Sequence, residues 1–415
     1  MAHYASRRDF LKAGSACAAG VTMTATSYAR VAGANERISI GMIGCGSRGV
    51  NAHMKGVNRH AKKENVEFTA VCDPWRLRRE AAAELVKKWT GKPARQFVSY
   101  RDVVTLKDLD AVMIASCDHQ HTTHMEAAAK AGKHIYCEKP LAMDLDKLNA
   151  ACDAVRKAKI CFQAGTQVRS WPSSRGCQKF FQTGELGKIS RIEQLRNSTR
   201  PYWYSYLKEA KEKDVDWKEF LMDRPMRPFR ADLFTGWYGY RDFSAGPIPG
   251  LGSHFIDLIN YITGSKLPIS AVAQGGTYSW KDEHNFTCPD QAQATWEYPE
   301  GFLVSYTSNF GNSAGSRILF CGDHGTMNLT PWSKPTVSGE GARKKGKLDK
   351  IVAIDPVEGP DHFLDWLQCM RDGKTPNASI DAGYQHAVAV IMAMKAFDSG
   401  QKQIYDPKKR LLHSA

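Results

Sequence analysis

The stretch that decides the fold is Ile38-Ser39-Ile40-Gly41-Met42-Ile43-Gly44-Cys45-Gly46-Ser47-Arg48-Gly49. An apolar, strand-like run leads into the pattern G-x-G-x-x-G, and a helix-compatible stretch follows it. In that context Gly44 makes the tight turn, Gly46 lets the backbone approach a pyrophosphate, and Gly49 lets the helix pack on the strand. The helix N-terminus adds N–H donors beside Ser47 and Arg48. The stretch predicts a dinucleotide-binding turn, with a purely structural glycine-rich turn as the alternative.

A second strand is predicted over 66–72 and ends at Asp73. A carboxylate at this place can bind the ribose hydroxyls of the cofactor, which favours NAD. Three arginines follow closely, and one of them could hold the 2′-phosphate of NADP: Arg76, Arg78 and Arg79. We therefore expect NAD, leave NADP open, and count Arg76 among the cofactor-binding residues.

Strand-like and helical segments alternate through the N-terminal part of the chain. Helical spacing of apolar residues is found over 76–90, 121–132 and 144–157, and buried strand-like runs over 97–98, 110–116, 134–137 and 160–164. Strict alternation predicts an α/β fold with a parallel, doubly wound sheet of the Rossmann type, over residues 35–165. Further strands are predicted over 271–277, 291–298, 303–308 and 317–321, with closing helices over 362–370 and 382–397.

The predicted strand at 134–137 runs directly into Glu138, Lys139 and Pro140. Ligands of doubly wound sheets bind at the carboxyl ends of the strands, so Lys139 is placed to face the cofactor. Its ammonium could polarise a reacting oxygen or transfer a proton. The alternative is a surface lysine in a turn.

A second motif lies in the stretch 246–264, where apolar residues form one face of a predicted helix. His254 is expected near the start of that helix, where the positive helix end lowers the pKa of a histidine. A neutral imidazole suits a general base. Asp257 follows one turn later and could orient the helix or the ligand; a capping role is the alternative for His254.

Taken in order, these motifs resemble the Gfo/Idh/MocA family (glucose-fructose oxidoreductase, inositol dehydrogenase, rhizopine catabolism). The motifs are G-C-G-S-R-G at 44–49, Asp73, C-E-K-P at 137–140, G-E-L-G-K-I at 184–189 and G-S-H-F-I-D at 252–257. The resemblance implies a C-terminal α/β domain over 166–415 with an open, mostly antiparallel sheet, and assembly into homodimers or homotetramers. It also implies Lys139 and His254 as catalytic residues, Glu138 beside the cofactor, and Gln167 and Arg169 near the substrate.

One position departs from the family pattern. Dehydrogenases of the family carry Asp four residues before the motif histidine, and this chain has Gly250 there. The incomplete set leaves room for a tightly bound cofactor that is reduced and reoxidised within one cycle.

Aromatic residues and arginines interleave between residues 202 and 241. Sugar C–H faces stack on aromatic rings, and arginine can hold a hydroxyl, carboxylate or phosphate. From this segment we select Trp237, Tyr238 and Arg241 as substrate contacts, although most of its rings are expected in the core.

Composition narrows the remaining choices. The chain has 415 residues, a net charge of +14 and eleven cysteines without a C-x-x-C pair. The scattered basic residues argue against nucleic acid as a partner, and no metal-ligand spacing or membrane-spanning run is found. The cysteines are typical of small buried residues rather than a disulfide framework.

The N-terminus has the features of a targeting signal. Ser6-Arg7-Arg8-Asp9-Phe10-Leu11-Lys12, followed by a mildly apolar stretch, resembles a twin-arginine export signal. We expect a leader over 1–34, export by the twin-arginine translocase, and a periplasmic location.

Three functions fit the sequence. The first is an NAD(P)-dependent oxidoreductase acting on a sugar or polyol carbon. The second is an NAD-dependent glycosidase or lyase that forms a transient keto-sugar from a glycoside. The third is a binding protein without catalysis, in which loss of Lys139 would leave ligand binding intact.

Overall fold

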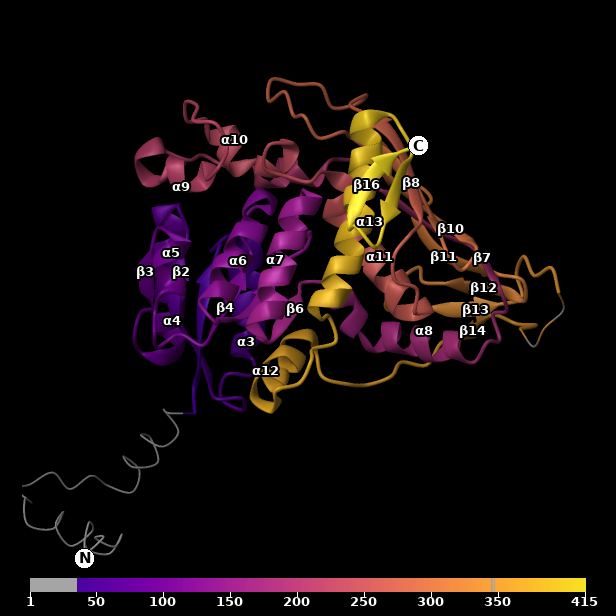
Figure 1. Ribbon diagram of the computed structural model, residues 1–415, viewed down its shortest axis with the longest axis horizontal. Helices are drawn as coiled ribbons and strands as arrows, with labels where there is room; N and C mark the ends of the chain where they lie inside the picture. Colours follow the sequence, from indigo (N-terminus) through magenta and orange to yellow (C-terminus); the bar gives the residue numbers. More distant parts are fainter. Residues whose placement is uncertain (1–35, 345, 347) are drawn as a thin grey trace, which may run out of the picture. The chain divides into compact units, whose positions relative to one another are not determined.

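The computed structural model of the chain describes residues 36–344, 346 and 348–415. The predicted leader over 1–34 lies outside them. Residues 39–415 form one compact unit built on two β-sheets, with helices packed between and around them (Figure 1). The predicted α/β class is confirmed.

The first sheet has six strands in the order β3-β2-β1-β4-β5-β6. The pairings β1–β4, β2–β3, β4–β5 and β5–β6 are parallel. Its strands are β1 (Ile38–Ile43), β2 (Val66–Cys72), β3 (Arg95–Phe97), β4 (Ala111–Ile114), β5 (His134–Cys137) and β6 (Phe162–Ala164). The helices that connect them are α4 (Arg76–Thr90), α5 (Tyr100–Val104), α6 (His121–Lys130) and α7 (Leu145–Ala158). The predicted doubly wound parallel sheet is confirmed, and the strand order reverses between β1 and β4, where such folds bind ligands.

The segment after the glycine loop differs from a regular α-helix. It begins as the π-helix η1 (Arg48–Met54) and continues as the short α3 (Lys55–Asn58). π-Helical turns are found frequently at functional sites. Short 3₁₀ helices, η2 (Asp118–Gln120) and η3 (Gln167–Ser170), follow β4 and β6 at the same edge of the sheet.

The second sheet has ten strands in the order β14-β13-β12-β11-β7-β10-β9-β8-β15-β16. Only the β10–β7 pairing is parallel among those described, so the expected open, mostly antiparallel sheet is confirmed. Its strands are β7 (Ile189–Asn197), β8 (Ser270–Gly276), β9 (Gln291–Tyr298), β10 (Phe302–Asn309), β11 (Arg317–Gly322), β12 (Gly325–Asn328), β13 (Thr336–Ser338), β14 (Val352–Ala353), β15 (Gln403–Asp406) and β16 (Leu411–Ser414).

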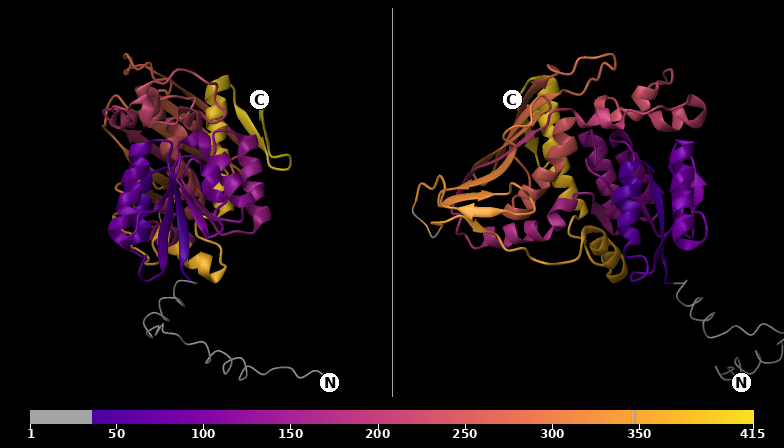
Figure 2. Two further views of the ribbon diagram at one scale, coloured as in Figure 1. Left: turned by 90° about the vertical axis from the view of Figure 1, so that its left-hand side faces the viewer. Right: turned by 180° about the vertical axis from the view of Figure 1, so that it is seen from behind.

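Helices join the two sheets into one unit. α11 (Pro247–Thr263) and α13 (Ile380–Ser399) pack on each other and on the second sheet, and α13 also contacts α7 and β6 of the first sheet (Figure 2). α8 (Pro172–Gln182) packs on α11, and α12 (His362–Asp372) packs on α3. This packing places the middle of α11 close to the strand ends of the first sheet.

Residues 198–246, which connect β7 to α11, lie across the ends of α5 and α6 (Figure 1). We call them the cover segment. The segment contains η4 (Tyr202–Tyr206), η5 (Glu212–Asp214), α9 (Trp217–Leu221), α10 (Ala231–Thr235) and η6 (Trp237–Gly239). Most of its rings form a buried aromatic cluster, as expected, which includes Trp203, Trp217, Phe220, Phe234 and Phe243.

Candidate active site

The glycine loop has the backbone that its sequence predicts. Gly44 has φ of 93°, a conformation that favours glycine, and its N–H donates to the Cys72 carbonyl at 2.8 Å. A β-carbon on Gly49 would stand 2.0 Å from the Gly44 carbonyl oxygen, so a side chain there would break the contact between helix and strand. A β-carbon on Gly46 would first meet the Arg78 guanidinium, at 3.3 Å. Gly46 therefore faces the cavity and leaves room for a phosphate to approach.

Asp73 forms part of the wall of this cavity, at the end of β2. Its carboxylate accepts the N–H groups of Cys45 at 2.7 Å and Trp75 at 2.8 Å. Burial raises the pKa of Asp73, while Arg78 and the two N–H groups oppose the rise. A carboxylate fixed in this way keeps lone pairs for ribose hydroxyls.

Most of the predicted cofactor residues surround one cavity. Gly44, Gly46, Ser47, Arg48, Asp73, Glu138 and Lys139 line it together with Trp237 and Tyr238 of the cover segment. Arg76 does not line it, which corrects our prediction for that residue. The Arg76 guanidinium is held by Glu80 at 2.9 Å and by Asp214 at 2.6 Å. Arg78 lies in the cavity wall instead, 4.6 Å over the ring of Trp75.

Glu138 is the centre of a buried polar cluster at the inner end of the cavity. Its Oε1 accepts from Gln167 Nε2 at 2.8 Å and lies 3.0 Å from His53 Nε2 and 3.7 Å from Arg48 Nε. Burial alone would raise the pKa of Glu138, but Arg48, His53 and Lys139 hold it well below its usual value. Glu138 is therefore an anion that fixes Arg48 at the cavity. Sequence reasoning missed His53, whose only signal was its place on the first helical turns after the glycine loop.

Lys139 lines this end of the cavity, and its charge acts on His254, which does not line the cavity itself. Lys139 Nζ donates to the Gly250 carbonyl at 2.6 Å, and burial lowers the pKa of Lys139 although Glu138 opposes the change. Burial and then the charge of Lys139 lower the pKa of His254 to about 3. His254 is thus a neutral imidazole at neutral pH.

The reason for the low pKa of His254 differs from our prediction. α11 begins at Pro247, so His254 lies about two turns inside the helix rather than at its start. The positive helix end therefore does not act on it, because that effect falls off within the first turn. The pKa of His254 is lowered instead by burial and by the charge of Lys139.

Tyr202 lies against the same turn of α11. A β-carbon on Gly250 would stand 2.6 Å from the Tyr202 hydroxyl, and this buried hydroxyl has no hydrogen-bond partner among the described residues. The Tyr202 ring packs edge-on against Tyr238, with ring centres 5.3 Å apart. Tyr202 therefore takes the space that a larger side chain at position 250 would need.

The other predicted substrate contacts are placed differently. Arg169 and Asp257 form a buried ion pair at 2.7 Å, which accounts for both residues without a ligand. Gln167 holds Glu138 and Tyr136. Arg241 does not line the cavity: it pairs with Asp398 at 2.9 Å on the surface toward α13. Of the cover residues that we selected, Trp237 and Tyr238 lie at the cavity, stacked 3.8 Å apart.

A second cavity, of about 350 Å³, lies where β7 ends and β11 begins. Tyr202 and Leu251 line it, and Leu251 directly follows Gly250 in α11. Tyr202 in turn contacts Tyr238 of the first cavity. The walls of the two cavities are thus linked by the Tyr202–Tyr238 contact and by the hydrogen bond from Lys139, which lines the first cavity, to Gly250, which precedes Leu251 of the second.

The residues fit a nicotinamide dinucleotide. The open side of Gly46, the carboxylate of Asp73 and the cations Arg48 and Arg78 supply a cradle for pyrophosphate and ribose. Within the described residues no group of His, Cys, Asp and Glu could hold a metal ion. All ten described cysteines are free, in agreement with the sequence interpretation. No helix in the described part of the chain is long and apolar enough to cross a bilayer.

Comparison with known proteins identifies the family of the chain. Residues 38–166 match an oxidoreductase family with an NAD-binding Rossmann fold, and residues 181–404 match the C-terminal α/β domain of the same family. The chain is 30% identical over 177 residues to the uncharacterized oxidoreductase YrbE of Bacillus subtilis, which covers 42% of this chain and 49% of that protein. It is 24% identical over 353 residues to the scyllo-inositol 2-dehydrogenase (NAD(+)) of Bacillus subtilis, covering 83% and 90%.

The fold is shared with a levoglucosan dehydrogenase solved in complex with NADH and levoglucosan. The TM-score is 0.67 at 18% identity, over 88% of this chain and 98% of that one. With both domains matched and an NAD-binding site in place, the chain belongs to the Gfo/Idh/MocA family of oxidoreductases.

Proposed function

We propose that the protein transfers hydride to or from a hydroxyl or carbonyl carbon of a sugar or polyol. The observation that carries this proposal is that Lys139 lines the cavity of the glycine loop, bonds Gly250 of α11 and acts by its charge on His254 of the same helix. Relatives named for scyllo-inositol and levoglucosan support this substrate class. NAD, when bound, supplies the hydride acceptor or donor.

The two residues have separate tasks. The Lys139 ammonium, freed from or shared with the Gly250 carbonyl, donates to the substrate oxygen and stabilises negative charge on it. His254 is a neutral imidazole whose Nδ1 has no partner in the described structure, so it can accept the hydroxyl proton. A chain that only bound a ligand would not need a buried lysine beside a neutral histidine.

We further propose that the cofactor stays bound and is recycled within one turnover. The cover segment is fixed by side-chain and backbone contacts to the elements that connect the strands of the first sheet. On one side Asp214 holds Arg76 at 2.6 Å and Glu219 accepts from Ser99 at 2.8 Å. In the middle, the Phe220 carbonyl accepts from Gln120 at 2.9 Å. These contacts, of which the Gln120–Phe220 hydrogen bond is buried, must break before a dinucleotide can leave.

Such a closed cycle also supports the second candidate, an NAD-dependent glycosidase or lyase. In that reaction a sugar carbon is oxidised, a neighbouring C–H becomes acidic, a group is eliminated, and the carbon is reduced again. Gly250 stands where dehydrogenases of the family carry Asp, and this incomplete set also favours the alternative.

The experiment begins with the purified protein. The protein is denatured, any released nucleotide is identified, and turnover of sugars and glycosides is measured with and without added NAD. Turnover without added NAD supports recycling, and the products decide between redox and elimination. Activity that depends wholly on added NAD contradicts recycling.

Lys139→Met tests the chemistry in the same assay. We expect turnover to fall by about 10²- to 10⁴-fold while bound nucleotide is retained. Full activity in the variant contradicts the proposed role of Lys139.

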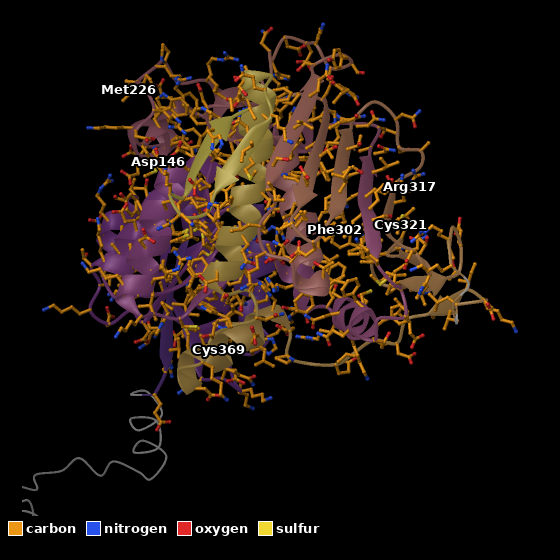
Figure 3. The ribbon with its side chains drawn as sticks, turned by 45° about the vertical axis from the view of Figure 1, so that its right-hand side comes forward. Asp146, Met226, Phe302, Arg317, Cys321 and Cys369 are labelled. Atoms are coloured by element: carbon orange, nitrogen blue, oxygen red, sulfur yellow. The ribbon has the colours of Figure 1, made fainter. Side chains whose placement is uncertain are left out.

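We also propose export and self-association. The twin-arginine pattern at residues 6–12 supports periplasmic export by the translocase, which Arg7→Lys/Arg8→Lys should abolish in cell fractionation. The sheet face opposite α11 leaves Leu303 49% and Val272 45% exposed, and Figure 3 shows Arg317 and Cys321 at this sheet. This face suits a homodimer or homotetramer contact, and sedimentation of Leu303→Glu should then show smaller species than the wild type.

A further inference from the structure

We infer that the cavity on the sheet face beside Gly250 binds a sugar that carries an anionic group, with Arg196 as the residue that selects for it. The inference rests on the proposed function, because it names the substrate class for the same site.

The charge of this cavity is one-sided. Arg196, Arg200 and Arg317 line it, and none of the described lining residues is acidic. Two of these arginines have other partners. Arg317 Nε donates to Glu193 at 2.8 Å, and the Arg200 guanidinium lies 4.7 Å over the ring of Tyr204. Arg196 is exposed and forms no ion pair with any described residue.

The strand register places Arg196 on the correct face. Side chains alternate along β7, so Gln194 and Arg196 share one face, while Arg191 and Glu193 share the other. Gln194 pairs with Tyr306 and Arg196 with Ser308, and Tyr306 reaches α11 at Gly252. Arg196 therefore lies on the α11 side of the sheet, which is the side of Lys139.

One buried polar group in the cavity wall, the side-chain amide of Gln194, is free to bind a ligand. Gln194 is 3% exposed, and its Oε1 has no hydrogen-bond partner within the described chain. A buried amide oxygen without a partner is costly, and a sugar hydroxyl would satisfy it. Trp332 and Tyr202 supply aromatic faces on the walls. The volume of about 350 Å³ falls within the usual range for small-molecule sites.

The cavity is electrostatically linked to the reacting end of the site. Burial is the largest cause of the lowered pKa of Lys139, and the charge of Arg196 acts in the same direction. An anionic substrate group bound at Arg196 would offset that charge. Its sugar carbons would then lie between Arg196 and the Lys139–Gly250 contact.

A planar guanidinium binds carboxylate and phosphate alike, so the shared chemistry is an anionic group on the sugar. The experiment compares hexoses in the gluco, galacto and manno series with their 6-carboxylates and their 6-phosphates. Binding is followed by tryptophan fluorescence, and turnover by chromatography of the sugar products. The proteins are the wild type, Arg196→Gln, Arg196→Lys, and Arg191→Gln as the matched control from the opposite face of β7.

In the wild type we expect one charged member of a series to exceed its neutral hexose in kcat/KM by about 10- to 100-fold. Arg196→Gln should remove this preference by raising KM for the charged sugar, and Arg191→Gln should keep it. Arg196→Lys should retain more of a preference for phosphate than for carboxylate, because only the fork geometry is lost. The preferred member identifies the anionic group.

A wild-type preference for the neutral hexose, an unchanged preference in Arg196→Gln, or no binding of any charged sugar would each overturn the inference. Failure of the proposed function looks different. In that case charged sugars bind with the dependence on Arg196, but no product forms from any sugar.

Discussion

The hydroxyl of Tyr202 stands 2.6 Å from the point that a β-carbon on Gly250 would occupy, while the Gly250 carbonyl accepts the hydrogen bond of Lys139. The Tyr202 ring cannot withdraw freely, because it packs against Trp203, Tyr238 and Phe310. Glycine at position 250 and tyrosine at position 202 are therefore coupled. Tyr202 fills the space that the carboxylate side chain of the family pattern would enter at position 250.

This coupling predicts a difference between two glycines in α11. Gly250→Ala should be about 1–3 kcal/mol less stable than Gly252→Ala, because the first overpacks against Tyr202. A β-carbon on Gly252 would lie 3.6 Å from Tyr306, an ordinary contact. Both changes remove the same helix penalty of glycine, so the difference reports the clash. Urea unfolding monitored by circular dichroism measures it.

The matched rescue is Tyr202→Phe. In Gly250→Ala the ring carbon Cζ is 3.7 Å from the new β-carbon, so removal of the hydroxyl should restore most of the loss. A double-mutant cycle gives the coupling energy. Equal stability of Gly250→Ala and Gly252→Ala, or no rescue by Tyr202→Phe, would show that the two sites are independent.

His254 predicts a pH dependence of stability. Its pKa is about 3 in the folded protein and about 6.5 in an unfolded chain. The unfolded state binds the extra proton in this window, so the stabilisation is fully present above pH 6.5 and is lost as the pH falls toward 3. His254→Asn should flatten the decline by up to about 1.4 kcal/mol per pH unit.

Chemical unfolding at several pH values between 4 and 7 tests this slope. His119 and His362 also have lowered pKa values, each about 4, and burial is the largest cause for both, so the wild-type decline does not vanish in His254→Asn. The exposed His413 is the control, and His413→Asn should leave the slope unchanged. Equal slopes for His254→Asn and the wild type contradict the prediction.

The cover segment predicts the rate of cofactor release. Glu219 joins it to the first sheet through Ser99 at 2.8 Å and Arg101 at 3.2 Å. Glu219→Gln weakens both charge-assisted contacts, so release of the bound nucleotide should accelerate by about 10-fold. Stopped-flow dilution against excess unlabelled cofactor measures the rate. Glu84→Gln on the exposed face of α4 is the control, and an unchanged rate in Glu219→Gln would mean that the cover does not limit release.

Arg169 and Asp257 predict a stability effect rather than a binding effect. Both side chains are buried, at 8% and 1% exposure, and they pair at 2.7 Å. Asp257→Asn leaves the arginine charge without its partner and should cost about 3–5 kcal/mol. The exposed pair of Lys130 and Glu126 is the reference, and Glu126→Gln should cost about 0–1 kcal/mol. If Asp257→Asn changes the KM for substrate and leaves stability unaltered, the prediction is contradicted, and the two residues contact the substrate instead.

The sequence alone determined the parts of this protein that rest on local chemistry. Three of these parts each follow a predicted strand: G-x-G-x-x-G, Asp73 and Lys139. Each suits the carboxyl end of a strand in a doubly wound sheet, where such folds bind their ligands. The alternation of strands and helices then gave the parallel sheet, and spacing gave the strands of the second sheet. These features depend on residues within about one helical turn or one strand, so the amino-acid sequence alone is enough to predict them.

Tertiary packing decided which long side chains reach the site. Arg76 and Arg78 are two residues apart, yet Asp214, 138 positions further along the chain, draws Arg76 away while Arg78 lines the cavity. In the same way, Arg169 forms an ion pair with Asp257, and Arg241 forms one with Asp398. The pKa of His254 followed from burial beside Lys139, which is 115 residues away in the sequence, and not from a helix end. Flexible cations pair with whichever carboxylate the fold brings near, and that partner is set by the three-dimensional packing alone.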